Sequence, residues 1–356
     1  MTSKNVAYFL SVGTIGLLIY VMYGHDLIFS KPRLPLYLIR EETDRLNKLH
    51  VRWGNHSEGR NYTTTLVTAF FGMEKAKHSL EEYKVWLKNF LGQVDTPIVI
   101  FTQPKFKDLM VQVRNGRPTH FVLYNEIWDV PWLLEPHSLH DDYHKMHAID
   151  PERSRHSPEL YAVWNSKPWF LQTMSELNPF NSTYFYWMDV GCVRESDIKL
   201  GNYPNLERSL EVFGEDERSE NYKKLNIFTV GRFPNYKPPP DSNTFEEMAE
   251  MDFVIGTFFG GTVYSINWFS RTFYAIHDVQ LSLGEFVGKD QTLYNWIATQ
   301  YPDRFRVVCS CQQILWNCRS GWFYFQEWYA GEDVANEDCR SAPVSNMTDF
   351  LLLDDD

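Results

Sequence analysis

The sequence predicts an α/β protein: a mostly parallel sheet with flanking helices, preceded by one N-terminal transmembrane helix. From residue 63 onward, short β-rich runs alternate with helical periods, a pattern typical of a largely parallel sheet. Hydrophobic residues make up 44% of the chain and charged residues 22%, a balance that excludes an intrinsically disordered protein. The third observation is Val6–Tyr23, an uncharged stretch long enough to cross a bilayer.

The N-terminal segment predicts a membrane signal anchor at residues 6–23, after a short tail at residues 1–5. A cleaved signal peptide is the main alternative, although its hydrophobic region is normally shorter, and a buried helix is the other. One lysine precedes the stretch and three basic residues soon follow it, so the charges do not favour a cytosolic N-terminus. A large C-terminal domain can be translocated regardless of these charges, so we expect a single-pass, type II protein whose larger part lies in a lumen.

Polar residues of mixed charge at positions 24–62 predict a stem that links the anchor to the main domain. Four N-x-S/T sequons occur, at Asn55, Asn61, Asn181 and Asn346. The net charge of −12 argues against nucleic-acid binding, which needs dense Lys and Arg. From residue 331 the chain loses its periodicity and ends in three Asp, which predicts a mobile acidic tail at 331–356.

In the first part of the main domain, four strands are expected, at Thr65–Phe71, Pro97–Thr102, His120–Tyr124 and Tyr184–Met188. Ser79–Leu91 predicts an amphipathic helix that Ser79 caps, with Glu82 completing a capping box. Leu160–Leu177 predicts helix, and Ser166-Lys167-Pro168 is expected to break it, with Ser166 as the cap of the second piece.

In the second part, three more strands are expected, at Ile227–Val230, Phe253–Phe259 and Arg306–Cys309. Gly260 and Gly261 predict a turn that leads into a helix ending near Asp278, and Gln291–Thr299 predicts another helix. These elements together define one domain at residues 63–330.

The five cysteines favour disulfides over a metal site. They are Cys192, Cys309, Cys311, Cys318 and Cys339. A zinc site among the last four would need two close pairs or added histidines, and no His follows His277. Cys309 and Cys311 are too close to bridge easily, so each would pair with Cys318 or Cys339, leaving Cys192 as a buried thiol.

Asp189 is the strongest candidate for chemistry, because it directly follows the most apolar strand. Ligands of open α/β sheets bind beyond the carboxyl ends of central strands. A carboxylate there needs a metal, a hydrogen-bond donor or a cation, and one interpretation is a divalent metal that grips a diphosphate. The alternatives are a helix cap or an ion pair with Arg194. Gly191 leaves room for a ligand to approach.

Two long blocks carry a family resemblance. Ser157–Leu171 and Asn178–Arg194 resemble the HtrL/YibB family, a glycosyltransferase-like group assigned to the GT-A superfamily. Further similar blocks are Thr65–Met73, Phe253–Phe269 and Gly288–Trp296. Gly256–Gly261 (GTFFGG) is also similar to a segment that lines the sugars in glycosyltransferases of the ABO blood-group type.

The resemblance implies a GT-A-like domain at residues 63–330 in a membrane-anchored glycosyltransferase of the Golgi or ER lumen. Its partners would be a nucleotide-sugar donor, a glycan or glycoconjugate acceptor, and the membrane through residues 6–23. Where most GT-A enzymes carry Asp-x-Asp, this chain has Asp-x-Gly at Asp189–Gly191. A single carboxylate can still hold Mn²⁺ or Mg²⁺ together with waters and diphosphate oxygens.

The same resemblance implies two catalytic residues, Asp189, which would also hold the metal, and Asp290. Further residues are expected to bind donor or acceptor: Asn165, Lys167, Gly191, Arg194, Gly260, Gly261, Lys289 and Gln291. Simpler interpretations stay open. Asn165 and Lys167 suit a capped helix start, and Asp290 suits the positive end of a helix dipole. The missing second carboxylate leaves a non-catalytic sugar- or nucleotide-binding protein as the alternative function, and a membrane-tethered interaction domain as a third.

A histidine cluster is the remaining candidate. It comprises His137, His140, His144, His147 and His156. Spacings of three and four residues place several of these on one helix face, so the cluster predicts either a metal site or a polar surface segment.

Overall fold

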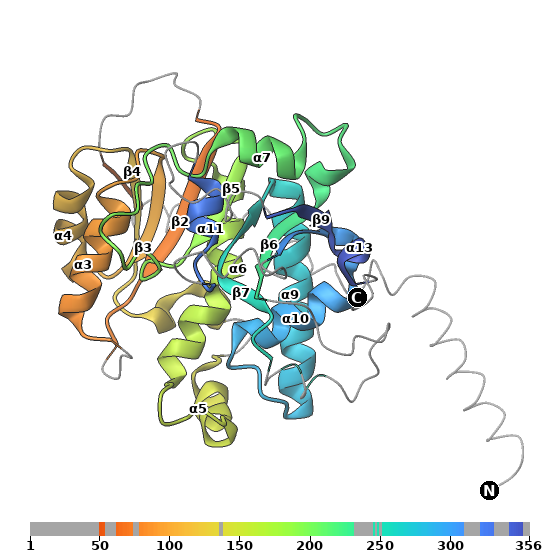
Figure 1. Ribbon diagram of the computed structural model, residues 1–356. Helices are drawn as coiled ribbons and strands as arrows, with labels where there is room; N and C mark the ends of the chain where they lie inside the picture. Colours follow the sequence, from red (N-terminus) through yellow and green to blue (C-terminus); the bar gives the residue numbers. More distant parts are fainter. Residues whose placement is uncertain are drawn as a thin grey trace, which may run out of the picture. The chain divides into compact units, whose positions relative to one another are not determined.

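One large sheet organises the domain, and helices cover both of its faces (Figure 1). The computed structural model describes residues 50–53, 62–73, 78–134, 138–230, 251–309, 321–330 and 342–351, together with Phe245 and Met248. All of these residues belong to a single compact unit, Lys48–Asp356.

Nine strands within the described residues make up the sheet. They are β1 His50–Trp53, β2 Thr64–Phe70, β3 Ile98–Thr102, β4 Thr119–Leu123, β5 Tyr184–Met188, β6 Leu225–Thr229, β7 Val254–Gly261, β8 Phe305–Cys309 and β9 Val344–Asn346. Their order across the sheet is β1-β4-β3-β2-β5-β7-β6-β8-β9. Seven of the strand regions were expected close to where they lie, because each is a short run rich in β-branched and aromatic residues.

The sheet is mixed, so the prediction of a mostly parallel sheet was wrong. Strands β4, β3, β2 and β5 run parallel to one another, as do β6 and β8. Between these two groups, β7 runs antiparallel to both β5 and β6, while β1 and β9 are antiparallel at the two edges. Apolar runs mark a strand as buried on both faces but carry no information on its direction.

The sheet divides the core into two layers, and helices cover each of them. Their bounds are α3 Leu80–Leu91, α4 Pro104–Arg114, α5 His140–Ile149, α6 Pro158–Leu177, α7 Leu206–Phe213, α9 Val263–Leu283, α10 Asp290–Gln300, α11 Phe325–Tyr329 and α13 Met347–Leu351. Short 3₁₀ turns are η1 Ile127–Asp129, η2 Pro131–Leu133, η3 Glu220–Lys223 and η5 Pro302–Arg304. Neighbours on a strand face opposite ways. Accordingly, Val67 packs into the core with α6, α9 and α10, whereas Leu66 packs into the core with α3 and α11.

The capping box predicted for α3 is confirmed. The Ser79 Oγ accepts a hydrogen bond from the Glu82 backbone N–H, and the Ser79 N–H donates to a Glu82 carboxylate oxygen at 2.8 Å. Both bonds satisfy backbone donors that the first turn of a helix leaves without partners.

Ser79→Ala is therefore expected to lower the free energy of unfolding by about 1 kcal/mol, as measured by urea denaturation. Ser79→Asp keeps a side-chain acceptor at the cap and serves as the control. Equal stability of Ser79→Ala and the wild type would show that the cap contributes nothing.

The predicted break in α6 was wrong, because Pro158–Leu177 form one continuous helix that Ser157 caps. Ser166 does not cap a second piece; its Oγ donates to the Ala162 carbonyl one turn earlier, at 2.6 Å. Pro168 is buried inside the helix. Burial of this helix between the sheet and α9 outweighs the local cost of the proline.

The turn predicted at Gly260 and Gly261 was also wrong, because both glycines belong to β7. Gly260 pairs with Tyr186 and Gly261 with Phe185 of β5. A Cβ on Gly260 would lie 2.4 Å from the Phe185 carbonyl oxygen, so the absence of a side chain lets two strands approach closely here. The glycines serve sheet packing and the strand simply continues through them.

Two predicted flanking segments contribute to the sheet. Residues 50–53, which fall in the predicted stem, form the edge strand β1 against β4. Residues 344–351, which fall in the predicted mobile tail, form β9 and α13, and Met347 and Phe350 are buried in the core. The side chain of Asn346, the last of the four sequons, takes part in the fold, because its Oδ1 accepts a hydrogen bond from the Lys224 ammonium at 2.8 Å.

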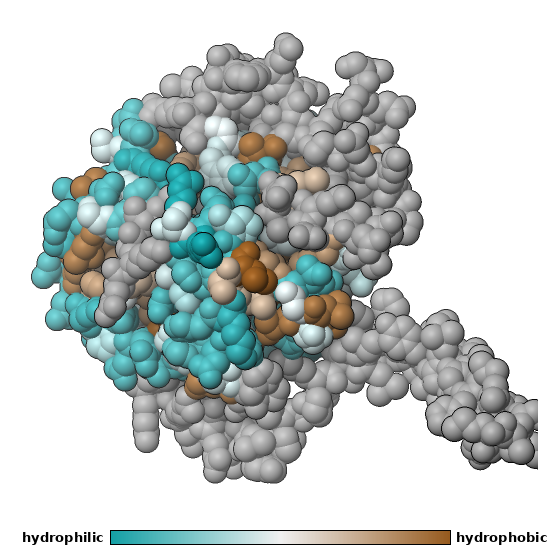
Figure 2. Space-filling view, turned by 90° about the horizontal axis from the view of Figure 1, so that it is seen from below, coloured by the Kyte–Doolittle hydropathy of each residue, from teal (hydrophilic) through white to brown (hydrophobic). Residues whose placement is uncertain are grey.

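Several predictions lie outside the described residues: the anchor at 6–23, the first two sequons, His137, and the cysteines after Cys309. Among the residues that are described, no helix is long and apolar enough to cross a membrane. Cys192 is a buried free thiol, as predicted. The face seen in Figure 2 is largely hydrophilic with separate hydrophobic patches.

Candidate functional site

The candidate site begins where β5 ends, in the middle of the sheet. Asp189 directly follows this strand, and its backbone N–H donates to the Thr257 carbonyl of β7 at 2.9 Å. The Trp187 indole N–H donates to the Asp189 carboxylate at 2.6 Å, which fixes the orientation of that carboxylate. The Asp189 side chain is 26% exposed, so part of the carboxylate faces solvent.

A buried lysine lies against this carboxylate. The Lys167 ammonium on α6 is 3.2 and 3.3 Å from the two Asp189 carboxylate oxygens and 3.0 Å from an Asp290 oxygen. It also donates to the Gly256 carbonyl of β7 at 3.0 Å. The ammonium therefore donates hydrogen bonds to Asp189 and to the Gly256 carbonyl and forms an ion pair with Asp290. Lys167 is only 3% exposed, so the cation that pairs with Asp189 is buried.

Asp290 is the third charged residue of the site, and its carboxylate contacts the Lys167 ammonium. It is the first residue of α10, where the helix dipole favours a negative charge. Its approach depends on Gly256, because a Cβ there would lie 3.0 Å from the Asp290 Oδ2 and 3.3 Å from the Tyr294 ring. We call Lys167, Asp189 and Asp290 the charged triad; with one ammonium and two carboxylates it carries a net charge of −1.

Burial and mutual attraction set the protonation of the triad. Burial raises the pKa of Asp189 and of Asp290, and the Lys167 ammonium opposes this shift without cancelling it. Burial lowers the pKa of Lys167, but the two carboxylates outweigh burial and the pKa is raised overall. Lys167 is therefore the most firmly charged member, and the carboxylates owe their ionisation to it.

The structure thus brings together three of the predicted site residues. It does not support the predicted ion pair between Asp189 and Arg194. The exposed Arg194 guanidinium instead stacks on Trp86 and Phe323, 4.8 and 5.1 Å from the ring centroids. Gly191 also faces this aromatic group, because a Cβ there would lie 3.2 Å from Trp86 and from Tyr83. The space beside Gly191 is occupied by protein.

Asn165, two residues before Lys167 on α6, is fully buried. Its amide donates to the Tyr143 hydroxyl and to the Val287 carbonyl, both at 2.9 Å. These bonds tie α6 to α5 and to the loop before α10. Asn165 therefore holds the scaffold of the triad, and the structure gives it no path to a ligand.

The other predicted binding residues have structural partners as well. The Lys289 ammonium pairs with Asp252 at 2.9 Å, and the Gln291 amide donates to the Val254 carbonyl at 2.9 Å. Gly260 and Gly261 lie in β7 opposite Tyr186 and Phe185, toward the amino end of β5. The structure does not bring these two glycines to Asp189.

The donor set around Asp189 does not fit the Mn²⁺ or Mg²⁺ predicted from the sequence. Oxygen-rich metal sites need carboxylates that are free to coordinate. Both carboxylates of the triad already face an ammonium. Within the described residues, no group of three or more His, Cys, Asp and Glu side chains is arranged to hold a metal.

The described histidines of the predicted histidine cluster likewise form no metal site. The centroids of the His140 and His144 rings on α5 lie 4.3 Å apart with the ring planes tilted by 35°, and His140 pairs with the neighbouring Asp141. His156 is buried against Asp150, with its Nδ1 2.8 Å from an Asp150 oxygen. Within this cluster, His140 and His144 are exposed at the surface, whereas His156 forms a buried hydrogen bond just before α6.

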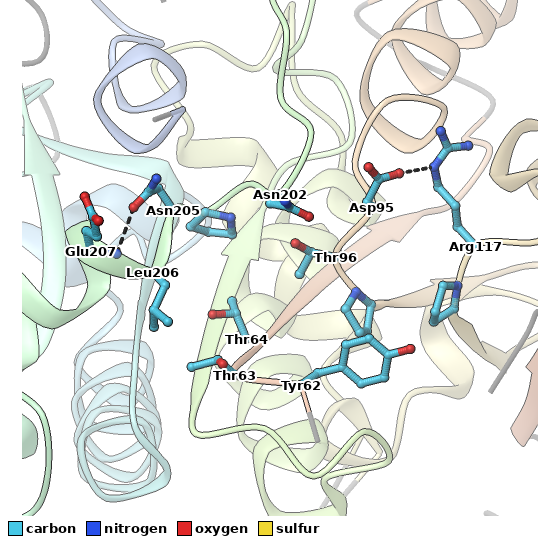
Figure 3. A pocket seen from close by; sticks show the side chains of 13 residues that line it. Tyr62, Thr63, Thr64, Asp95, Thr96, Arg117, Asn202, Asn205, Leu206 and Glu207 are labelled. Atoms are coloured by element: carbon cyan, nitrogen blue, oxygen red, sulfur yellow. Dashed lines mark hydrogen bonds and ion pairs between the residues drawn. The ribbon is translucent and has the colours of Figure 1, made fainter. Parts of the chain in front are cut away.

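A hollow of about 830 Å³ lies at the opposite end of the sheet, at the amino ends of β2, β3 and β4 (Figure 3). Thr64, Thr96 and Asn202 line its centre, and Arg117 pairs with Asp95 at its rim, at 2.7 Å. Arg117 and Asp95 are thus engaged with each other, and the third charged residue of the lining, Glu207, is exposed. The hollow is therefore separate from the triad, which lies beyond the carboxyl end of β5.

Sequence reasoning missed two residues of the site. Trp187 was read only as part of an apolar strand, and Gly256 only as part of a glycine-rich segment. The signal for Trp187 was its position two residues before Asp189, which puts both side chains on one face of the strand. The signal for Gly256 was a glycine within an expected strand, and the structure pairs that strand with β5.

Comparison with known proteins adds one family. The model of the family described as "Bacterial protein of unknown function (HtrL_YibB)" matches residues 62–325, which include the whole triad. The chain is 21% identical over 270 residues to Protein HtrL of Escherichia coli (strain K12), a match that covers 69% of this chain and 87% of that protein.

Proposed function

The chain belongs to the HtrL/YibB family, and from its site we propose that it is a membrane-anchored glycosyltransferase of the GT-A type. It would move a sugar from a nucleotide-sugar donor to a glycan or glycoconjugate acceptor. The observation that carries the proposal is Asp189: a carboxylate fixed by Trp187 and Lys167 and 26% exposed beyond the carboxyl end of a central strand.

Asp189 suits hydroxyl groups better than phosphate. An ionised carboxylate only accepts hydrogen bonds, and its oxygens can receive two neighbouring sugar hydroxyls. The triad carries a net negative charge, which repels a diphosphate. A suitable cation is the exposed Arg194, five residues after Asp189, because a guanidinium can bind phosphate oxygens in a bidentate manner. In this proposal Asp189 holds the sugar and Arg194 faces the diphosphate.

Asp290 acts through Lys167. Its side chain is 5% exposed and contacts the ammonium, so it is a positioning residue in place of the predicted catalytic base. Catalysis in this scheme comes from holding donor and acceptor in a reactive orientation.

A non-catalytic sugar- or nucleotide-binding protein is the second candidate. The pairing of both triad carboxylates with Lys167 favours it, because neither carboxylate is then an effective general base. Release of free sugar or nucleotide from a donor separates the two candidates, because a binding protein leaves the donor intact.

Asp189→Asn is expected to weaken binding of the recognised donor by about 10- to 100-fold, the loss of one or two hydrogen bonds to a charged acceptor. The amide retains an oxygen for the Trp187 N–H, so the fold should persist. Binding would be measured by thermal shift and titration against a panel of nucleotide sugars, with circular dichroism to check folding. Asp108→Asn, an exposed carboxylate on α4, is the matched control. Unchanged donor affinity in folded Asp189→Asn would refute the role of Asp189.

A further inference from the structure

The charged triad presents a disagreement between its residues and the metal that the GT-A resemblance implies. A GT-A metal would lie beside the acidic residue at the end of the central strand, between protein carboxylates and the donor. In this chain the Lys167 nitrogen lies 3.0–3.3 Å from oxygens of both carboxylates. The position where a cation would meet both carboxylates is therefore taken by the protein itself.

Lys167 is poorly able to leave that position. It lies on a continuous helix between Ser166 and Pro168, both fully or almost fully buried, and Ser166 accepts a hydrogen bond from the Trp132 indole at 2.8 Å. The ammonium contacts Asp189, Asp290 and the Gly256 carbonyl, and moving it away would leave a buried charge without partners. The Trp187 ring, 6.0 Å from the ammonium, closes a further side.

A divalent ion placed against the same oxygens would meet strong repulsion. Two cations within about 4 Å of each other repel in a partly buried site, where solvent screens them weakly. Moreover, one Asp189 oxygen already accepts the Trp187 N–H at 2.6 Å. That hydrogen bond takes up a lone pair that Mg²⁺ or Mn²⁺ would otherwise use, so a divalent ion here would compete with both Trp187 and Lys167.

We propose that Lys167 is the built-in cation of this site, an ammonium that holds Asp189 and Asp290 in place of a divalent metal, so that the wild-type site takes no Mn²⁺ or Mg²⁺. The proposal concerns the cation alone and does not depend on which reaction the protein performs.

The test measures metal binding directly. Full-length protein is stripped with EDTA, desalted and titrated with Mn²⁺, with free Mn²⁺ followed by electron paramagnetic resonance and the melting temperature by calorimetry. Three proteins are compared: wild type, Lys167→Met, and Lys167→Met/Asp290→Asn. Methionine has nearly the length of lysine without its charge, and the double variant removes one of the two freed carboxylates.

Wild type should bind no Mn²⁺ at this site and keep its melting temperature. Lys167→Met should gain a Mn²⁺ site, with its melting temperature rising by about 5 °C when Mn²⁺ exceeds Kd roughly 100-fold. The double variant should lose most of that gain. Folded Lys167→Met that gains no Mn²⁺ binding would overturn the inference.

The wild-type titration keeps the inference falsifiable even if Lys167→Met does not fold. Stoichiometric Mn²⁺ binding by wild type that Asp189→Asn abolishes would contradict it. Neither outcome alters the test of the proposed function, because donor binding is measured separately.

Discussion

Replacing Lys167 with Met is expected to lower the free energy of unfolding by about 3–5 kcal/mol at neutral pH, the usual cost of removing one partner of a buried ion pair. The change leaves the Asp189 and Asp290 carboxylates close together without their cation. Urea denaturation followed by tryptophan fluorescence measures the loss. Lys145→Met is the matched control: its ammonium also pairs with an aspartate, Asp142, but is 73% exposed, so its loss should cost less than about 1 kcal/mol.

The size of this loss should depend on pH in a known direction. Burial raises the pKa of both triad carboxylates in the folded protein, and without Lys167 the largest opposing influence on that shift is lost. An acid with a raised folded pKa stabilises the fold below its unfolded pKa, and that contribution is lost as pH rises through the folded pKa. Lys167→Met should therefore be less destabilised at pH 5 than at pH 8. An equal loss at both values would mean that the carboxylates are not the cause.

Gly260→Ala is expected to destabilise the protein by about 3 kcal/mol through overpacking. Its Cβ would lie 2.4 Å from the Phe185 carbonyl oxygen and 2.8 Å from the Tyr186 Cα, both backbone atoms of the central strand β5. Backbone in the middle of a sheet cannot move aside without breaking its ladder.

Calorimetry of Gly260→Ala and of Gly321→Ala makes this comparison. A Cβ on Gly321 has no heavy atom within 4 Å, so this control should keep the wild-type melting temperature. If Gly260→Ala has the melting temperature of the wild type but an altered donor affinity, the glycine would instead belong to a ligand site, as the sequence suggested.

The elements of the fold were largely accessible from the sequence, and their directions were not. Tyr184–Met188 was predicted and observed as a strand with the same bounds, because a run of five large apolar residues ending at an acid allows little else. The reversal of β7 was not visible, since an antiparallel strand in the interior of a sheet is as apolar as a parallel one. Only its pairing with β5 and β6 reveals it.

For the site, the sequence identified the individual residues better than their relations. Asp189, Lys167 and Asp290 were each singled out, but Asp189 was paired with Arg194, its neighbour in sequence, or with a metal. The true partner lies 22 residues earlier, on a helix that packs across the sheet. Residues that are close along the chain are easy to connect, whereas a contact across two layers depends on the register of strands and helices.

The glycine-rich segment illustrates the same limit at finer scale. All of Gly256, Gly260 and Gly261 lie on β7, and resemblance pointed to the last two. Gly256 is the one whose carbonyl contacts Lys167 and whose missing side chain admits Asp290. A shift of four residues along a strand moves a position by about 13 Å, from one end of the sheet to the other.

The order of the triad along the chain has a consequence for how the protein folds. Lys167 and Asp189 belong to consecutive elements, α6 and β5, so closing their contact costs little loop entropy, and the pair they form is neutral. The N-terminal half can thus form this pair during synthesis, before the later elements that bury it have emerged. Asp290 arrives later with α10 and brings the excess negative charge. Because burial raises its pKa, mild acidity should favour this last docking step while leaving the earlier pairing of strands unaffected.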